Sequence, residues 1–222
     1  MSTVTELQRE LDSVKAEMNG HAPRSVVETQ GELLQALRER GAGRNALGEG
    51  DAIPAFSLPD QVGAQIRIED FLKMGAVVIS FFRGEWCPYC QTELNALHMA
   101  LPEIEARNAR LVAISPQTLD HTMSTAERLL LEFSVLSDVG NEVSSRFGLA
   151  FEIPEEFREF HDTYSARVSD YNGDESYVLP VPATYVVDSG GVIRYAHVEV
   201  DPSLRAEPAD VIAALESLWG RG

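Results

Sequence analysis

The chain has 222 residues, of which 44% are hydrophobic, and its 35 acidic and 18 basic side chains give a formal net charge of −17. This length suffices for one sizeable domain with an appendage, and the acidity argues against a nucleic-acid or anionic-membrane surface, which needs a basic patch. Because there is no signal-peptide pattern and no apolar run near the ~20 residues that span a bilayer, we expect a cytoplasmic, reducing location with no membrane contact.

Residues 1–47 predict a separate N-terminal helical arm. Thr3 and Glu6 match a capping box, and apolar residues recur at helical spacing from Leu7 to Met18. The Gly-His-Ala-Pro sequence at 20–23 ends this helix, and a second helix is predicted over 27–40. The arm either covers the core of its own subunit or forms a homodimer interface.

From residue 48 to 222 the pattern alternates between apolar runs and amphipathic segments, which is typical of an α/β domain. Strands are predicted at 55–58, 65–68, 76–82, 110–115, 133–138, 182–188 and 192–198. Helices are predicted from residue 69 and over 91–101, 118–132, 141–147 and 208–219. Residues 151–180 are rich in acids and aromatics and are expected to be irregular. This order predicts a mostly parallel sheet covered on both faces.

The sequence Trp-Cys-Pro-Tyr-Cys at 86–90 holds both cysteines of the chain. It follows a predicted buried strand and opens a predicted helix, so Cys90 falls in the first helical turn. Free N–H groups and the helix dipole stabilise a thiolate there, and such surroundings lower a cysteine pKa from about 8.5 to roughly 3.5–7.5. The motif is therefore a candidate redox site.

Two other interpretations of this cysteine pair have less support. A structural disulfide between Cys87 and Cys90 would close a very short loop and constrain the unfolded chain little. A structural zinc site needs four ligands, and the five histidines are scattered without a His-x₃₋₅-His pattern. We therefore expect a redox role without a metal or another cofactor.

Four segments of the chain resemble a known family. They are LGEGDAIPAFSLPD at 47–60, SFFRGEWCPYCQTEL at 80–94, LVAISPQ at 111–117 and LPVPATYVVD at 179–188. They resemble the peroxiredoxin-like branch of the alkyl hydroperoxide reductase/thiol-specific antioxidant (AhpC/TSA) family. The resemblance covers roughly residues 47–222 and implies a thioredoxin-like fold with a central mixed sheet and helices on both faces.

The family alignment places Cys90 at the peroxidatic cysteine. It places Cys87 where the family has a catalytic Thr or Ser, Arg83 where it has a proline, and Pro182 where typical members have an arginine. The resemblance thus implies a peroxidase in which Cys90 attacks hydrogen peroxide or an organic hydroperoxide and Cys87 closes the disulfide. It also implies that the chain lacks the hydroxyl and the arginine that orient the peroxide. Arg83 either supplies the missing charge or is a solvated surface arginine.

A thioredoxin-like thiol–disulfide oxidoreductase is the alternative. In that alignment Cys87 attacks a substrate disulfide, Cys90 resolves it, and Pro182 is a cis-proline beside the site. Trp86, Pro88 and Tyr89 of the motif are expected to line the site. Trp86 and Tyr89 either shape the docking surface or pack half-buried. Thr184 either lines the site from the opposite side or packs in its strand.

Further expectations follow for the surroundings of the site. Glu85 is expected to be a solvated charge rather than a group that tunes a thiol. The substrate is a peroxide or a disulfide, and the electron donor is a thioredoxin- or glutathione-type thiol. A third interpretation is a non-enzymatic redox-sensing or metal-binding module that makes contacts through the acidic segment 152–174. The sequence leaves open which cysteine is the nucleophile.

Overall fold

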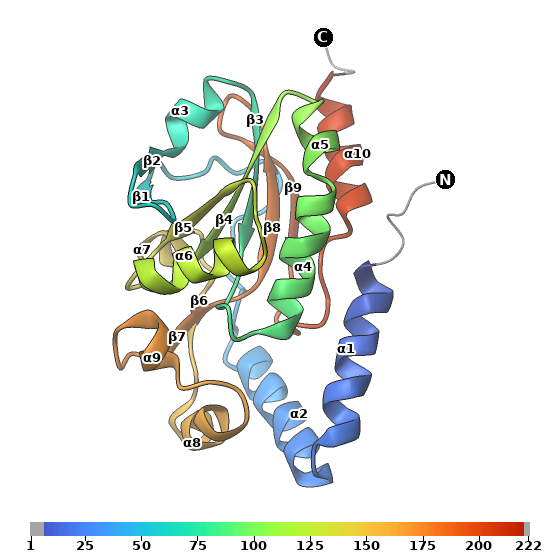
Figure 1. Ribbon diagram of the computed structural model, residues 1–222, viewed down its shortest axis with the longest axis vertical. Coiled ribbons are helices and arrows are strands. Elements are labelled where there is room, and N and C mark those ends of the chain that lie inside the picture. The colour runs from blue at the N-terminus through green and yellow to red at the C-terminus, as the bar shows by residue number, and fades with distance from the viewer. Residues whose placement is uncertain (1–6, 220–222) are drawn as a thin grey trace.

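The computed structural model describes residues 7–219 and contains a central five-stranded sheet in the order β5-β4-β3-β8-β9 (Figure 1). β3, β4 and β5 run parallel to one another, whereas β8 and β9 are antiparallel to their neighbours. The sheet is therefore mixed, as the family resemblance implied. The strands are β3 (Ala76–Phe81), β4 (Ala109–Ser115), β5 (Ser134–Ser137), β8 (Ala183–Val187) and β9 (Ile193–Val198).

Successive side chains of each strand point to opposite faces of the sheet and contribute to two hydrophobic layers, one on each face. In β3, Val78 joins one layer, while Val77 and Ile79 join the other. The first face is covered by α4 (Pro88–Met99), α5 (Leu101–Glu105), α6 (Leu119–Arg128) and α10 (Pro208–Trp219). The second face is covered by α3 (Ile68–Leu72), α7 (Glu142–Arg146) and the hairpin of β1 (Ser57–Pro59) and β2 (Gln65–Arg67).

The N-terminal arm consists of α1 (Leu7–His21) and α2 (Arg24–Glu39). Leu7 and Leu11 of α1 are buried in the layer that contains α4, and α1 packs against α4 (Figure 1). The interpretation that the arm covers the core of its own subunit is therefore confirmed for α1. The homodimer interface stays a prediction.

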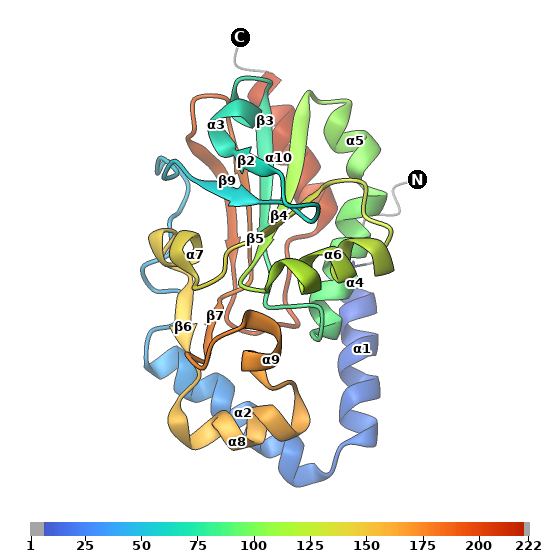
Figure 2. The same ribbon diagram turned by 60° about the vertical axis from the view of Figure 1, so that its left-hand side comes forward.

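Residues 151–180 are not irregular, so that prediction is wrong. β6 (Ala150–Glu152) and β7 (Val178–Pro180) pair antiparallel and enclose α8 (Glu155–Tyr164) and α9 (Val168–Asn172). Figure 2 shows α8 near α2, at the end of the molecule opposite the C-terminus. Arg40, which follows α2, is joined to Glu156 of α8 by an ion pair of 2.6 Å, so the arm and the segment 151–180 share an end of the molecule.

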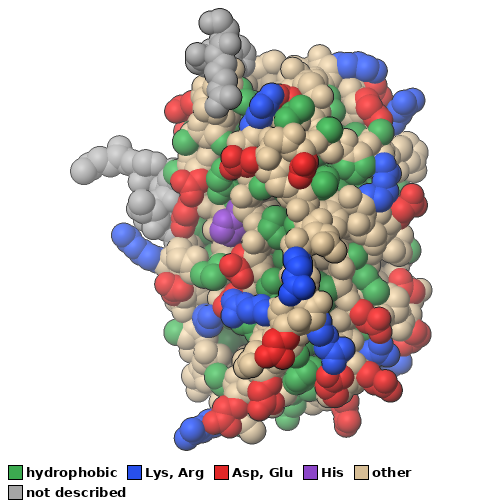
Figure 3. All heavy atoms as spheres, turned by 180° about the vertical axis from the view of Figure 1, so that it is seen from behind, with side chains coloured by type: hydrophobic (Ala, Val, Ile, Leu, Met, Phe, Trp, Pro, Cys, Tyr) green, Lys and Arg blue, Asp and Glu red, His purple; other side chains and the backbone are tan. Residues whose placement is uncertain are grey.

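The surface carries charges of both signs. Figure 3 shows acidic, basic and hydrophobic side chains interspersed over the face opposite to that of Figure 1. None of the helices within residues 7–219 has both the length and the apolar character that a membrane crossing requires.

Candidate active site

The two cysteines lie at the junction between β3 and α4, as predicted. Cys87 is the N-cap of α4, and its Sγ accepts a hydrogen bond of 3.3 Å from the backbone N–H of Cys90. The two Sγ atoms are 2.8 Å apart, and both residues are fully buried as free thiols. A disulfide needs a separation of about 2.05 Å, so oxidation of the pair to a disulfide would require the sulfurs to approach by less than about 1 Å.

Two arginines bracket the sulfur pair. Arg83 Nη2 donates a hydrogen bond of 3.1 Å to Cys87 Sγ, and Arg205 Nη2 lies 3.5 Å from Cys90 Sγ. Arg83 is half-buried and Arg205 is buried. The expectation that the chain lacks an active-site arginine is therefore wrong, because Arg205 reaches Cys90 from the loop before α10. The solvated alternative for Arg83 is wrong as well.

Glu93 and Thr184 hold Arg205 in place. Glu93 Oε2 accepts a hydrogen bond of 2.5 Å from Arg205 Nη1, and both side chains are 1% exposed. The other carboxylate oxygen of Glu93 accepts from Thr184 Oγ1 at 2.9 Å. Thr184 is thus connected to the Cys90 sulfur through two residues, because it fixes the Glu93 carboxylate, which in turn fixes Arg205.

The environment separates the pKa values of the two thiols. Burial raises the pKa of Cys90, but the hydrogen bond between the two sulfurs and the charges of Arg205 and Arg83 outweigh it and hold that pKa well below its usual range. Burial and the same hydrogen bond raise the pKa of Cys87 well above its usual range, against the effect of Arg83. These surroundings favour the thiolate on Cys90 and the neutral thiol on Cys87.

Trp86 contacts Arg83 directly, and His161 in turn contacts Trp86. The Arg83 guanidinium lies over the Trp86 ring at 5.1 Å, and the His161 ring from α8 meets Trp86 edge-on at 5.2 Å. His161 Nδ1 is 2.7 Å from the carbonyl oxygen of Ala166, to which it donates. Burial and, secondarily, Arg83 lower the pKa of His161 to about 4, so its imidazole is neutral at pH 7.

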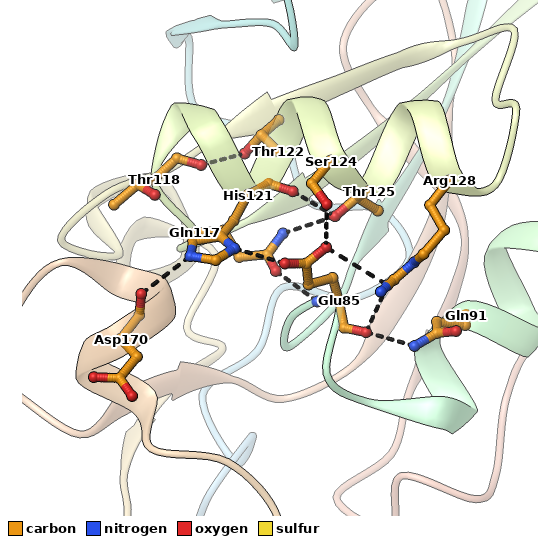
Figure 4. A network of polar contacts seen from close by, with 10 residues as sticks. All are labelled: Glu85, Gln91, Gln117, Thr118, His121, Thr122, Ser124, Thr125, Arg128 and Asp170. Carbon is orange, nitrogen blue, oxygen red and sulfur yellow. Dashed lines mark hydrogen bonds and ion pairs between the residues drawn. The ribbon is translucent and has the colours of Figure 1, made fainter.

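Glu85 anchors the loop that carries the motif (Figure 4), so the expectation of a solvated charge is wrong. One of its carboxylate oxygens lies 2.6 Å from His121 Nδ1, and the other accepts from Ser124 Oγ at 2.9 Å. Arg128 adds an ion pair of 3.5 Å and donates to the Glu85 carbonyl oxygen at 3.0 Å. The Glu85 carboxylate therefore fixes the loop to α6 and does not contact the thiols.

A cleft of about 380 Å³ is lined in part by residues of the motif, although neither cysteine is among its lining residues. Among the residues that line it are five of the predicted supporting residues: Arg83, Trp86, Pro88, Tyr89 and Pro182. Thr184 is not among them. All peptide bonds within residues 7–219 are trans, so Pro182 is not the cis-proline that the thioredoxin-like alternative implied.

Sequence reasoning missed Glu93, His161 and Arg205. Glu93 had a usable signal, because it follows Cys90 by three residues and so lies on the same face of α4. Arg205 had none, since it is 115 residues from Cys90 in the sequence. Within residues 7–219, no three His, Cys, Asp or Glu side chains are grouped so that they could hold a metal ion.

Sequence comparison finds relatives over the region that contains the motif. The profile of the AhpC/TSA family matches residues 49–196. Peroxiredoxin Bcp of Escherichia coli (strain K12) is 32% identical over 105 residues, which are 47% of this chain and 67% of that protein. The chloroplastic peroxiredoxin Q of Sedum lineare is 27% identical over 149 residues, which are 67% of this chain and 68% of that protein.

Solved structures share the fold at lower identity. Peroxidoxin BcpB from Mycobacterium tuberculosis superimposes with a TM-score of 0.61 at 22% identity, covering 78% of this chain and 98% of that chain. A mutant PrxQ from Xylella fastidiosa superimposes with a TM-score of 0.59 at 15% identity, covering 78% and 96%. These likenesses confirm the thioredoxin-like fold.

Proposed function

The chain belongs to the AhpC/TSA family and is a thiol-dependent peroxidase of the peroxiredoxin type, and from that premise we propose that Cys90 is its peroxidatic cysteine and Cys87 its resolving cysteine. The observation that carries this assignment is the position of Cys90 Sγ, which lies between the Cys87 thiol at 2.8 Å and Arg205 at 3.5 Å. A thiolate is the nucleophilic form of cysteine, and this position stabilises the thiolate on Cys90.

In the first step the Cys90 thiolate attacks the terminal oxygen of the hydroperoxide. The O–O bond breaks, Cys90 becomes a sulfenic acid, and the remaining oxygen leaves as an alkoxide, or as hydroxide from hydrogen peroxide. The leaving oxygen needs a proton, and the Cys87 S–H is the nearest one to Cys90 Sγ. Cys87 thereby performs the role of the Thr or Ser hydroxyl that the family has at this position.

In the second step the Cys87 thiolate attacks the Cys90 sulfenic acid. The Sγ–Sγ bond forms, hydroxide leaves and is protonated to water, and the two cysteines have together supplied two electrons. An external dithiol of the thioredoxin type then reduces the disulfide by exchange and completes the cycle. We place this chemistry in a reducing compartment, in keeping with the absence of further cysteines from the chain.

One observation favours a second candidate, thiol–disulfide exchange with Cys87 as the attacking group. Cys87 Sγ receives hydrogen bonds from both Arg83 and the Cys90 N–H, and such donors stabilise an N-cap thiolate. The complete burial of both sulfurs counts against this candidate, because a protein disulfide would have to reach them through the enclosing side chains.

Stopped-flow oxidation of the reduced protein by hydrogen peroxide tests the assignment, with Cys87→Ser and Cys90→Ser as matched variants. We expect Cys90→Ser to abolish fast oxidation. Cys87→Ser should still react and should stop as a sulfenic acid that dimedone traps on Cys90. Oxidation no faster than that of free cysteine, with rapid exchange against a model disulfide that requires Cys87, would instead establish the exchange reaction.

A further inference from the structure

The loop that carries Arg205, between β9 and α10, is folded around a tight turn. Asp201 Oδ1 accepts hydrogen bonds from the backbone N–H of Ser203 at 3.0 Å and from its hydroxyl at 2.7 Å. Within this turn the carbonyl oxygen of Pro202 accepts a hydrogen bond of 3.0 Å from Arg205 Nε. The conformation of the turn therefore helps to set where the Arg205 guanidinium lies.

The N-terminal helix α1 holds this loop through polar side chains. Lys15 Nζ donates a hydrogen bond of 3.0 Å to Ser203 Oγ and lies 3.5 Å from Asp201 Oδ2. Gln8 is seven residues earlier and so lies on the same side of the helix, where its Nε2 donates to the Ser203 carbonyl oxygen at 3.1 Å. The backbone N–H of Gln8 donates to Glu207 Oε1 at 2.9 Å. α1 thus binds both the turn and the end of the loop.

The apolar side of α1 packs on the helix that carries the nucleophile. Leu7 and Leu11 are buried in the same hydrophobic layer as Cys90, and Figure 1 shows α1 beside α4. α1 therefore contacts the elements on both sides of the pair formed by Cys90 and Arg205. Residues 7–21 lie outside the region 49–196 that matches the family, so this support comes from a part of the chain that the family profile does not match.

The contact between Arg205 and the sulfur is sensitive to the position of the loop. Arg205 Nη2 lies 3.5 Å from Cys90 Sγ, a distance at which a hydrogen bond is already long. Glu93 holds the neighbouring nitrogen Nη1, and the Pro202 carbonyl oxygen holds Nε on the backbone side. A displacement of the turn would move the second of these points and carry Nη2 away from the sulfur, which weakens the attraction between the two charges.

We propose that α1 positions Arg205 against the Cys90 sulfur, and that Lys15 acts as a positioning residue through the turn formed by Asp201 and Ser203. The Lys15 ammonium contacts the turn, so its effect on the thiolate is indirect. The inference rests on the proposed role of Cys90 as the peroxidatic cysteine. It gives the N-terminal arm a part in the reaction as well as in the core.

The lower apparent pKa of the thiol pair, measured from thiolate absorbance at 240 nm against pH, tests this role. We expect Lys15→Met to raise it by about 0.5–1 unit, part of the ~1–3 units by which a neighbouring arginine lowers the pKa of an acid. At pH values below that pKa, single-turnover oxidation by hydrogen peroxide should slow about three- to tenfold, because the thiolate fraction falls by that factor. The urea unfolding midpoint should stay close to that of wild type, because the Lys15 side chain is 46% exposed and exposed ion pairs contribute little.

Arg9→Met is the matched control for Lys15→Met. Arg9 is an exposed cation on the same helix, and within residues 7–219 it has no hydrogen bond or ion pair. Both variants keep the titratable or charged groups that face the Cys90 sulfur, which are Cys87, Arg83, Arg205 and Glu93. Arg9→Met should therefore leave the apparent thiol pKa unchanged. An equal rise in the two variants, or no rise in Lys15→Met, would overturn the proposal.

Two further variants separate positioning from a direct effect of charge. Asp201→Ala removes a negative charge, which by charge alone would lower the thiol pKa; because it also opens the turn, positioning predicts a rise. In the background Glu93→Gln/Arg205→Met there is no Arg205 to position, so adding Lys15→Met should shift the pKa no further. The positioning role is wrong if Asp201→Ala shows no rise, or if Lys15→Met shifts the pKa again in that background.

The absorbance titration needs no peroxide, so it is independent of the proposed function. If hydrogen peroxide oxidises the wild-type thiols no faster than free cysteine, the peroxidase assignment fails, and the pKa values of Lys15→Met and Asp201→Ala still decide the positioning role. If oxidation is fast but Lys15→Met has the wild-type pKa, the positioning role fails and the peroxidase assignment stands.

Discussion

Arg205 forms a buried ion pair with Glu93, and this pair holds the arginine against the Cys90 sulfur. The two partners come from distant parts of the chain, α4 and the loop before α10. Burial raises the pKa of the Glu93 carboxyl, and the charge of Arg205 opposes that effect. The ion pair therefore links the stability of the fold to the state of the nucleophile.

Replacing Arg205 with methionine should affect stability and reactivity together. Glu93 would keep a buried carboxylate without a cation, which costs about 3–5 kcal/mol of unfolding free energy. Cys90 would lose a positive charge beside its sulfur, so its pKa should rise and its oxidation at neutral pH should slow. Urea unfolding measures the first effect, and a pH titration of thiolate absorbance at 240 nm measures the second.

The double variant Glu93→Gln/Arg205→Met is the control for that prediction. It removes both charges, so it should recover most of the stability that the single variant loses. A single Arg205→Met variant as stable as the wild-type protein would show that the ion pair does not contribute in the way its burial indicates.

His161 should make the protein less stable in acid. Its pKa is about 4 in the folded protein and about 6.5 when unfolded. Between these values the unfolded chain binds a proton that the folded chain excludes, so the unfolding free energy falls as the pH drops from 6.5 to 4, by about 3 kcal/mol in total. In His161→Phe this loss should be absent, although the lost hydrogen bond to Ala166 costs about 1 kcal/mol at pH 7.

Urea unfolding of both proteins at pH 7.0, 5.5 and 4.5 measures the difference. The gap between wild type and His161→Phe should narrow and then reverse as the pH falls. Two parallel curves of unfolding free energy against pH would contradict the assignment of a buried, neutral imidazole.

Removing the Glu85 carboxylate should loosen the loop before the motif. In Glu85→Ala, Ser124 and His121 lose their acceptor, and we expect a loss of about 1–3 kcal/mol of unfolding free energy. Glu132→Ala is a suitable control, because Glu132 is 81% exposed and contacts His98 only at 3.6 Å. Equal unfolding midpoints in urea for the two variants would count against an anchoring role.

The sequence predicted the elements that have a strong pattern. The apolar runs of β3, β4 and β8 and the helix at 208–219 appear close to where they were expected. Local pattern also placed both cysteines at a strand-to-helix junction. The helical spacing of Phe157, His161 and Tyr164 in α8 was present too, but the density of acids and aromatics in the segment concealed it.

Tertiary pairing was beyond the reach of the local pattern. A glutamate such as Glu85 is usually exposed, and only its three partners on α6 explain its burial. Arg205 carries no local signal that distinguishes it from any other loop arginine. Arg205 reaches the site because the chain folds back against α4, which brings residues more than 100 positions apart into contact.

The 2.8 Å separation of the two sulfurs also determines how the protein withstands its own substrate. A sulfenic acid on Cys90 has two fates: condensation with the neighbouring sulfur, or attack on a second peroxide to give the irreversible sulfinic acid. The first is intramolecular, and a well-placed neighbour acts as a very high local concentration. Reaction of the Cys90 sulfenic acid with a second peroxide must therefore compete with attack by Cys87, which is already in contact. Irreversible inactivation should require peroxide concentrations far above those that sustain turnover.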